Sequence, residues 1–272
     1  MVCLAGRKAR GALLLFGLVS LFVLLAITRG VTGPNAVASR VRALGGWTDR
    51  KPSDFSKFLK RIGWRKDYGA IRSIEIFNAQ LTSDDFEMIG RQSELEVLRL
   101  CRTNITDADL RHFSELKHLR ILNLKQTTLT GAGLRELNSL NELDSLVLSD
   151  TRVSDDAIEE VVRFKNLGFV NLTGTNISAV SLSRFGTLEQ LRIVQLRRTQ
   201  VKLLDFMELP YFGRRGHVLG GPPLTGVELS DDEATPQDLT AVRKRFPHVE
   251  FHVEPLTFPV KPLESPEGNE EH

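Results

Sequence analysis

The chain has 272 residues, of which 41% are hydrophobic, and this length and composition are sufficient for one or two domains with a sizeable core. Lys and Arg total 36 and Asp and Glu total 34; residues 1–30 contain four of the basic residues and no acidic one, so the remainder has 32 basic and 34 acidic residues. This balance excludes the strongly basic surface of a nucleic-acid-binding protein, and the two cysteines, Cys3 and Cys101, are too few for a disulfide framework or a zinc finger.

The N-terminal part contains a hydrophobic segment, residues 11–28, in which no residue is charged. At a helical rise of about 1.5 Å per residue it spans about 27 Å, close to the thickness of the hydrocarbon layer of a bilayer. We interpret residues 1–30 as a cytoplasmic tail and an uncleaved transmembrane signal anchor, with a cleaved signal peptide as the alternative. The basic residues of the tail, Arg7, Lys8 and Arg10, favour a cytoplasmic N-terminus. The sequence therefore predicts a single-pass membrane protein with the remaining chain outside the cytoplasm.

Residues 31–70 do not fit the repeat pattern that follows them. A short helical pattern starts near Pro34, but residues 31–46 suit a flexible stalk better than the segment after them does. Ser53 is a credible N-cap for a helix over residues 54–64, where hydrophobic residues recur at i, i+3, i+4 and i+7. We therefore predict a stalk, and then a helical N-terminal cap that covers the open end of a repeat array.

From residue 71 to residue 206 the chain repeats itself with a 24-residue period, and five consecutive units read L-x-x-L-x-L-x-x-T-x-[ILV]. The apolar columns are Leu95, Leu119, Leu143, Leu167 and Leu191; Leu98, Leu122, Leu146, Val170 and Val194; Leu100, Leu124, Leu148, Leu172 and Leu196; and Ile105, Leu129, Val153, Ile177 and Val201. The polar column is Thr103, Thr127, Thr151, Thr175 and Thr199. A Thr hydroxyl can bond to backbone groups of a turn, and no His or acid accompanies it at matching spacing. We therefore interpret the Thr column as structural rather than as a row of nucleophiles.

Within each unit the hydrophobic spacing switches from alternation, typical of a strand, to steps of three and four, typical of a helix. A Thr or Ser stands where each helical half begins, and Asp residues follow several of them in the first turn. These predicted N-caps are Thr82, Thr106, Thr130, Ser154 and Ser178. The strands should stack in parallel, with their leucines pointing into the coil.

The C-terminal part of the array is less regular. A Gly- and Pro-rich insertion at residues 213–223 interrupts it, and the register returns with predicted strands at Val227 and Phe251. The array therefore extends over residues 71–253. Residues 254–272 are rich in Pro and Glu, and we expect this tail to be disordered.

Residues 71–253 resemble leucine-rich repeat proteins of the ribonuclease-inhibitor-like, strand-plus-helix kind. The T-x-[IV]-[TS]-D-x-x-[LI] run, present as Thr103 to Leu110 and Thr151 to Ile158, resembles repeats of uncharacterised bacterial membrane-anchored proteins. The resemblance implies an α/β fold, a right-handed β-α solenoid with a parallel sheet on its concave face, here preceded by one transmembrane helix. It also implies binding of a protein partner, without catalysis, a cofactor or a small-molecule substrate. Similar repeats recognise substrates in eukaryotic ubiquitin ligases, but those carry an adaptor-binding F-box where this chain has its hydrophobic segment.

Strand alternation predicts which residues lie on the concave face. The column Val97, Ile121, Ser145, Phe169 and Ile193 would form an apolar stripe, with polar and basic residues beside it. Such an arrangement is typical of a protein-binding patch. The candidate protein-binding residues are Val97, Arg99, Ile121, Asn123, Lys125, Phe169, Asn171, Ile193, Gln195, Arg197 and Arg198. In the alternative interpretation, the preceding turn or the N-terminal cap covers the side chains of the stripe.

One cluster offers a chemical alternative. His248, Glu250, His252 and Glu254 alternate along the last predicted strand, and imidazoles and carboxylates two residues apart can share a metal ion. The alternative function is thus a metal-binding protein or a metal-dependent enzyme. Charged residues on an outer strand also discourage edge-to-edge pairing, and we prefer that interpretation because no nucleophile or phosphate-binding loop accompanies them.

Overall fold

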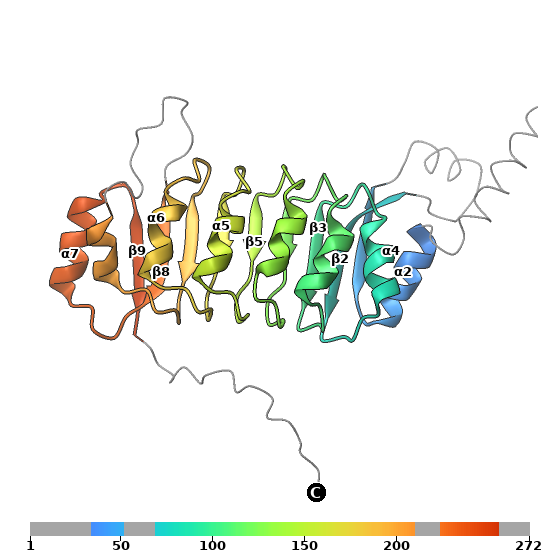
Figure 1. Cartoon of the computed structure of the whole chain (residues 1–272), viewed down its shortest axis with the longest axis horizontal. Helices are drawn as coiled ribbons and strands as arrows, with labels where there is room; N and C mark the ends of the chain where they lie inside the picture. Colours follow the sequence, from blue (N-terminus) through green and yellow to red (C-terminus); the bar gives the residue numbers. More distant parts are fainter. Residues whose placement is uncertain (1–33, 52–68, 210–223, 256–272) are drawn as a thin grey trace, which may run out of the picture.

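The computed structural model describes residues 34–51, 69–209 and 224–255, which form one elongated stack of repeats (Figure 1). Its described strands make a single nine-stranded sheet in sequence order, with β2 to β9 parallel and β1 antiparallel to β2. The strands are β1 (Trp47–Lys51), β2 (Ala70–Phe77), β3 (Val97–Cys101), β4 (Ile121–Asn123), β5 (Ser145–Val147), β6 (Phe169–Asn171), β7 (Ile193–Leu196), β8 (Gly226–Ser230) and β9 (Glu250–Glu254). The predicted α/β repeat fold with a parallel sheet is confirmed.

The strand register follows the repeat period of the sequence. Val97 of β3 is opposite Ile121 of β4, and each following strand down to β7 keeps that spacing. Ile193 of β7 is opposite Gly226 of β8, a longer step along the chain, so the insertion lengthens one repeat without changing which side chains face the core. The regular spacing returns between Gly226 and Glu250. The predicted register is therefore correct on both sides of the insertion.

Five of the seven described helical halves contain a 3₁₀-helix (η), where the spacing indicated α-helices, and two of these five continue as a short α-helix. The helices are α2 (Pro34–Ala43), α4 (Ser83–Gly90), η1 (Asp107–Phe113), η2 (Ala132–Leu137), η3 (Asp155–Ala157), α5 (Ile158–Val161), η4 (Ala179–Ser181), α6 (Leu182–Phe185), η5 (Leu203–Glu208) and α7 (Pro236–Arg245). A 3₁₀-helix rises about 2.0 Å per residue, so it covers the length of a strand with fewer residues than an α-helix needs. The short repeat unit therefore favours it.

The core is continuous from one end of the stack to the other. Leu122, Leu146 and Leu148 have no exposed surface, and the same holds for most members of the four apolar columns. Phenylalanines extend this core on the helix side, as in the edge-to-face pair Phe86 and Phe113, whose ring centroids are 6.3 Å apart. Each repeat thus buries its apolar face only against its neighbours.

The Thr column behaves as predicted. The Thr127 hydroxyl donates to the Leu124 carbonyl at 2.8 Å, and the hydroxyls of Thr103, Thr151, Thr175 and Thr199 make the equivalent bond within their own turns. The connection between repeats is made by the backbone instead, for example from Arg102 N to Lys125 O at 2.9 Å. The residue at the position of Arg102 has a left-handed φ angle between 54° and 70° in six repeats. These six residues are Asn78, Arg102, Gln126, Asp150, Gly174 and Arg198.

Aspartates at the start of the helical halves tie neighbouring repeats together. Asp107 accepts hydrogen bonds from the backbone and hydroxyl of Thr130 (2.9 Å each) and from the N–H groups of Gly131 (3.0 Å) and Gly133 (2.9 Å). Burial acts to raise the pKa of Asp107, but these four donors outweigh it and lower the pKa below its usual value. Asp155 binds Ser178 of the next repeat in the same way. The sequence pattern predicted these aspartates only as partners of the helix dipole.

The N-terminal end of the sheet is covered by α2 and β1. Val37 and Val41 of α2 are buried in the core, so the stalk interpretation is wrong for the residues of this helix. The chain from residue 34 has hydrophobic residues that reach the core, and it folds back as β1 against β2. The predicted helix at 54–64, the hydrophobic segment 11–28, the insertion 213–223 and the tail from 256 lie outside the described residues. Among the residues that are described, no helix has the length and hydrophobicity needed to cross a bilayer.

Candidate binding face

The sheet has one face packed on the leucine core and one face on which no described element packs as a second layer; we call the latter the open sheet face. Val97, Ile121, Ser145, Phe169 and Ile193 lie in register across it, on β3 to β7. Each of the five is half-buried and none is part of the fully buried core. The structure therefore places the predicted apolar stripe at the surface.

The second column of the open sheet face consists of Glu75, Arg99, Asn123, Val147, Asn171, Gln195 and Glu228, all half-buried. At one end, the Arg99 guanidinium forms an ion pair with Glu75. At the other end, Gln195 Nε2 donates to Glu228 Oε2 at 2.9 Å. Both ends of this column are thus satisfied within the protein, and the three central residues lie between them.

The two asparagines of this column have fixed orientations. Asn123 Oδ1 accepts from Lys125 N at 3.0 Å and from the Cys101 thiol at 3.4 Å, and Asn171 Oδ1 accepts from Thr173 N at 2.9 Å. Within the described part of the chain, neither Nδ2 group has a hydrogen-bond partner. Each amide therefore holds its oxygen against the backbone and leaves its two N–H donors for another group.

The basic residues predicted for the rim are neutralised by acids that sequence reasoning did not place there. Arg197 forms ion pairs with Glu228 at 3.2 Å and with Glu254 at 2.9 Å. Arg198 pairs with Asp150 at 2.6 Å, and Lys125 lies 3.9 Å from the same carboxylate. The rim is therefore polar but close to neutral, which disfavours a strongly acidic ligand.

Two glycines close to the ends of β6 allow ion pairs between repeats that are not adjacent in the stack. Arg192 reaches Asp144 at 3.0 Å across Gly168, and Arg198 reaches Asp150 across Gly174. A Cβ atom on Gly168 would collide with the Arg192 guanidinium, and one on Gly174 would lie 2.5 Å from the Asp150 carboxylate. The ion pairs Arg192–Asp144 and Arg198–Asp150 thus lie at the two ends of β6, the strand that carries Phe169.

An exposed aromatic corner at the N-terminal end of the open sheet face was missed by the sequence analysis. Trp47 of β1 is 58% exposed and is opposite Glu75, while Phe77 at the end of β2 is 50% exposed. The repeat pattern could not assign Trp47, since β1 precedes the array and pairs antiparallel to it. By contrast, Cys101, the last residue of β3, is buried, and that burial raises the pKa of its thiol.

Comparison with known sequences is consistent with this architecture. Residues 93–153 match the family model described as "Leucine rich repeat". Residues 93–153 are thus leucine-rich repeats. An internalin (inlF) from Listeria monocytogenes is a similar solved structure, with 14% sequence identity, a TM-score of 0.40, and coverage of 75% of this chain and 68% of the internalin chain. No curated protein matches the chain.

The last described strand, β9, carries three of the four residues considered for metal binding. Glu250, His252 and Glu254 lie exposed on β9, with His252 Nε2 3.7 Å from Glu250 Oε1, while Glu254 is paired with Arg197 and His248 precedes the strand. In the described part of the chain, no group of three or more His, Cys, Asp or Glu is arranged to hold a metal ion. Exposed charged residues on an outer strand are typical of protection against edge-to-edge pairing.

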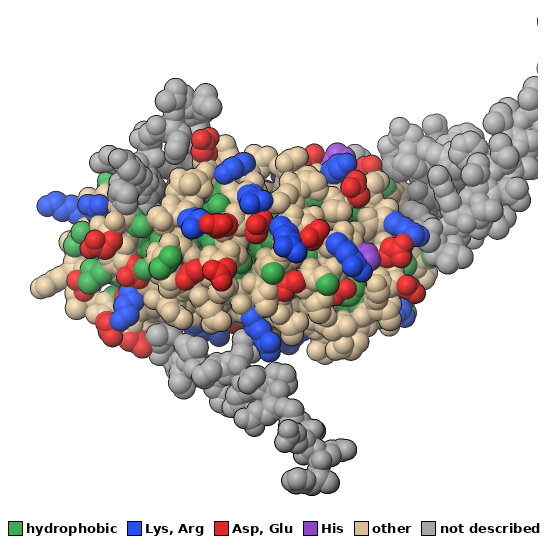
Figure 2. Space-filling model, viewed as in Figure 1, with side chains coloured by type: hydrophobic (Ala, Val, Ile, Leu, Met, Phe, Trp, Pro, Cys, Tyr) green, Lys and Arg blue, Asp and Glu red, His purple; other side chains and the backbone are tan. Residues whose placement is uncertain are grey.

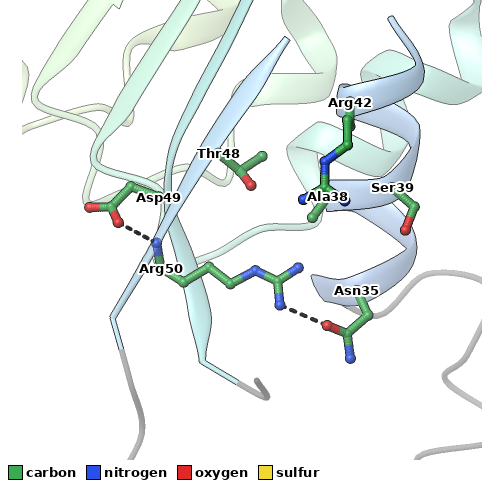
Figure 3. Close-up of a pocket in the computed structure, with 7 residues that line it drawn as sticks. All are labelled: Asn35, Ala38, Ser39, Arg42, Thr48, Asp49 and Arg50. Atoms are coloured by element: carbon green, nitrogen blue, oxygen red, sulfur yellow. Dashed lines mark hydrogen bonds between the residues drawn. The ribbon is translucent and has the colours of Figure 1, made fainter. Parts of the chain in front are cut away.

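Outside the open sheet face, the repeat protein has a polar cleft of about 430 Å³ between α2 and β1 (Figure 3). Arg50 spans the cleft and donates to Asn35 Oδ1 at 2.7 Å, and Arg42 lines it from α2. On the face shown in Figure 2, basic and acidic side chains are interspersed and hydrophobic side chains form only small separate groups. Neither surface has a row of apolar side chains like that of Val97, Ile121, Phe169 and Ile193 on the open sheet face.

Proposed function

We propose that this leucine-rich repeat protein is a non-catalytic interaction module that binds a protein partner on its open sheet face. The observation that supports this proposal most directly is the stripe of Val97, Ile121, Phe169 and Ile193, which are half-buried on a face that no described element covers. Partly exposed apolar side chains in one row, with a polar and nearly neutral rim, have the composition of a protein-binding patch. The polar residues beside the stripe would set orientation rather than supply most of the affinity.

The test is a pair of charged substitutions, Phe169→Asp and Ile193→Asp, each measured for unfolding and for capture of partners by the chain as bait. We expect capture to fail, because a carboxylate in the centre of the patch would lose its hydration on binding. We expect the free energy of unfolding to change by about 1 kcal/mol or less, because these side chains are only half-buried. The matched control is Val180→Asp on the helix side, where Val180 is 73% exposed.

Two outcomes would reject the proposal. Capture that survives both substitutions would move the binding site to another surface. A loss of several kcal/mol in stability would show that Phe169 and Ile193 belong to the core instead.

We further propose that residues 11–28 anchor the protein in a membrane, with the N-terminus in the cytoplasm and the repeats outside it. The support is the sequence alone, namely an uncharged hydrophobic segment preceded by a short basic tail. Protease added to intact cells or spheroplasts should digest the repeats while cytoplasmic marker proteins stay whole. Repeats that survive until the membrane is lysed would contradict this orientation.

A further inference from the structure

Two arginines line the polar cleft between α2 and β1 from opposite walls. Arg42 comes from α2 and Arg50 from β1, and in Figure 3 both side chains extend into the space between the helix and the strand. The hydroxyl of Thr48 points into the same space. Asp49 turns its carboxylate to the other side of β1, where it accepts a hydrogen bond from Arg50 N at 2.8 Å. The cleft is therefore lined by positive charge and by hydrogen-bond donors.

Regular secondary structure builds both walls of the cleft. Thr48 and Arg50 are two residues apart on β1, so strand alternation turns them to the same side. On the other wall, Asn35, Ser39 and Arg42 recur along α2 at steps of four and three residues, which is one face of a helix. A different face of α2 carries the buried valines that pack on the core. The packing of α2 on the sheet therefore fixes the position of its polar face against β1.

The two arginines of α2 differ in their partners. Arg40 forms an ion pair with Asp85, with Nε 2.7 Å from Oδ1. The Arg42 guanidinium, by contrast, has no hydrogen-bond or ion-pair partner within the described part of the chain. Arg50 donates to the uncharged Asn35 amide oxygen at 2.7 Å, which holds its guanidinium across the cleft. Two like charges that line one cleft repel each other, and an anion bound between them would be attracted by both.

A phosphate group is the anion whose shape fits these donors. Its oxygens are arranged tetrahedrally, so it can accept hydrogen bonds from two walls at once, whereas a carboxylate presents its oxygens in one plane. Guanidinium groups bind phosphate oxygens in pairs, and a threonine hydroxyl can donate one further bond. The volume of about 430 Å³ lies within the range of ligand sites, about 300–1,000 Å³. The cleft therefore has room for a phosphate ester as well as for inorganic phosphate.

The position of the cleft along the chain favours a lipid as the source of the phosphate. Five residues, 29–33, separate the hydrophobic segment 11–28 from Pro34, the first residue of α2. Whatever its structure, this connection spans at most roughly 22 Å, at about 3.6 Å per residue. With residues 11–28 in a membrane, the cleft lies close to the lipid headgroups. Trp47, at the start of β1, is 58% exposed at the same end of the stack, and Trp is enriched at membrane interfaces.

We propose that the cleft between α2 and β1 binds the phosphate group of an anionic membrane lipid, with Arg42, Arg50 and Thr48 as hydrogen-bond donors. The phosphate chemistry rests on the cleft alone, while the lipid source rests on the membrane anchor of the proposed function. Binding of a headgroup holds the N-terminal end of the stack at the membrane surface. The open sheet face is a separate surface of the molecule and keeps its proposed protein partner.

The experiment measures the binding of two soluble probes to the full-length chain in an uncharged detergent. Isothermal titration calorimetry is carried out with inorganic phosphate and with dihexanoyl-phosphatidylglycerol below its critical micelle concentration. We expect saturable binding of both probes and a lower Kd for the lipid, because its acyl chains also bury apolar surface in the micelle beside the cleft. A Kd for inorganic phosphate equal to or below that of the lipid would overturn the lipid source. Absence of binding by both probes would overturn the site.

Substitutions of one arginine test the donors. Arg42→Gln should raise the Kd of the lipid roughly tenfold, because it removes charge-assisted hydrogen bonds from one wall. Arg42→Lys should give an intermediate Kd, since an ammonium group keeps the charge but not the paired donors. The melting temperature should change little in either variant, because Arg42 is exposed. An unchanged Kd in Arg42→Gln would overturn the assignment of the cleft.

The matched control is Arg152→Gln, which removes the same charge from an exposed residue just after β5. Four strand spacings separate β5 from β1, or roughly 19 Å, which exceeds the Debye length of about 8 Å in physiological salt. We therefore expect the Kd to stay within about twofold of the parent. Equal weakening in both variants would show attraction by net charge only and would overturn the site. Failure here leaves the capture test and the protease test unaffected, since calorimetry in detergent uses neither a protein partner nor a bilayer.

Discussion

The two sides of the sheet connect neighbouring repeats by different means. On the helix side, carboxylates such as Asp107 accept several hydrogen bonds from the backbone of the next repeat, and leucines fill the core between them. On the open side, the ties are ion pairs between side chains that stay partly in water, such as Arg192 with Asp144. Backbone donors satisfied by a charge contribute more to stability than exposed ion pairs do. The helix side therefore carries the stability of the stack, and the open sheet face is left free to change for binding.

The largest expected effect is on the core side of β5. Leu148→Ala should cost about 2–5 kcal/mol in unfolding free energy, because Leu148 is fully buried between two neighbouring repeats. The adjacent residue supplies the comparison: Val147→Ala, on the open sheet face, should cost about 1 kcal/mol or less because Val147 is only half-buried. Chemical denaturation of both variants measures the difference. Equal losses in the two variants would mean that side chains on the open sheet face contribute as much to stability as those on the core side.

The next effect concerns the ties between repeats on the helix side. Asp107→Ala removes the acceptor of four hydrogen bonds from Thr130, Gly131 and Gly133, so we expect a loss of about 1–3 kcal/mol. Asp156→Ala is the control, since Asp156 is an exposed acid in the first turn of the equivalent segment two repeats on. It should change the unfolding free energy by about 0.5 kcal/mol or less. Equal losses of unfolding free energy in the two variants would mean that Asp107 acts only on the helix dipole and that its four hydrogen bonds add nothing measurable.

A third prediction tests the same side through pH. Asp85, only 4% exposed, accepts hydrogen bonds from Arg40 Nε at 2.7 Å and Nη2 at 2.9 Å, and the Arg40 guanidinium lowers the pKa of this carboxyl to about 2. A carboxyl with a depressed pKa stabilises the fold above its unfolded pKa, about 3.8, and loses that contribution as pH falls towards 2. We expect this contribution to be about 1–2 kcal/mol, since Arg40 is itself half in water.

The measurement compares denaturation of the parent and of Asp85→Asn at several pH values between 2 and 6. The difference in unfolding free energy between the two proteins should shrink as pH falls from 4 to 2. A difference that stays constant over this range would show that the ion pair does not hold α2 on α4.

Much of the fold could be predicted because the same residue pattern recurs in every repeat of the sequence. The columns of Leu98 and Thr103 recur at one spacing, and this constant period leaves one parallel register that keeps the leucines inside. The left-handed turn residue could not be predicted, because Arg102 and Gln126 occupy it as well as Gly174. The strand β1 was missed for a related reason: Trp47 and its charged neighbours do not alternate, and their pairing is fixed only by contact with β2.

The candidate site was predictable in position but not in chemistry. Alternation assigns Phe169 to the open sheet face, yet it cannot say how much of the side chain its neighbours cover. The neutral rim depends on pairs such as Arg198 with Asp150, which come from repeats that are not adjacent and meet only because Gly174 lies between them. The fixed amides of Asn123 and Asn171 likewise depend on backbone N–H groups whose direction no residue pattern shows.

The smallest expected effect is on the open side. Arg192→Gln removes the ion pair between Arg192 and Asp144. This ion pair passes over Gly168 of the intervening repeat and therefore links three repeats. Its energy should nevertheless be small, because the two side chains are 48% and 41% exposed and the pair is screened by salt. We expect a loss of about 0.5 kcal/mol or less at low salt, falling towards zero at about 1 M NaCl. A loss above about 1 kcal/mol that persists in high salt would contradict the comparison between the two sides, because the open side would then hold the stack together as strongly as the helix side does.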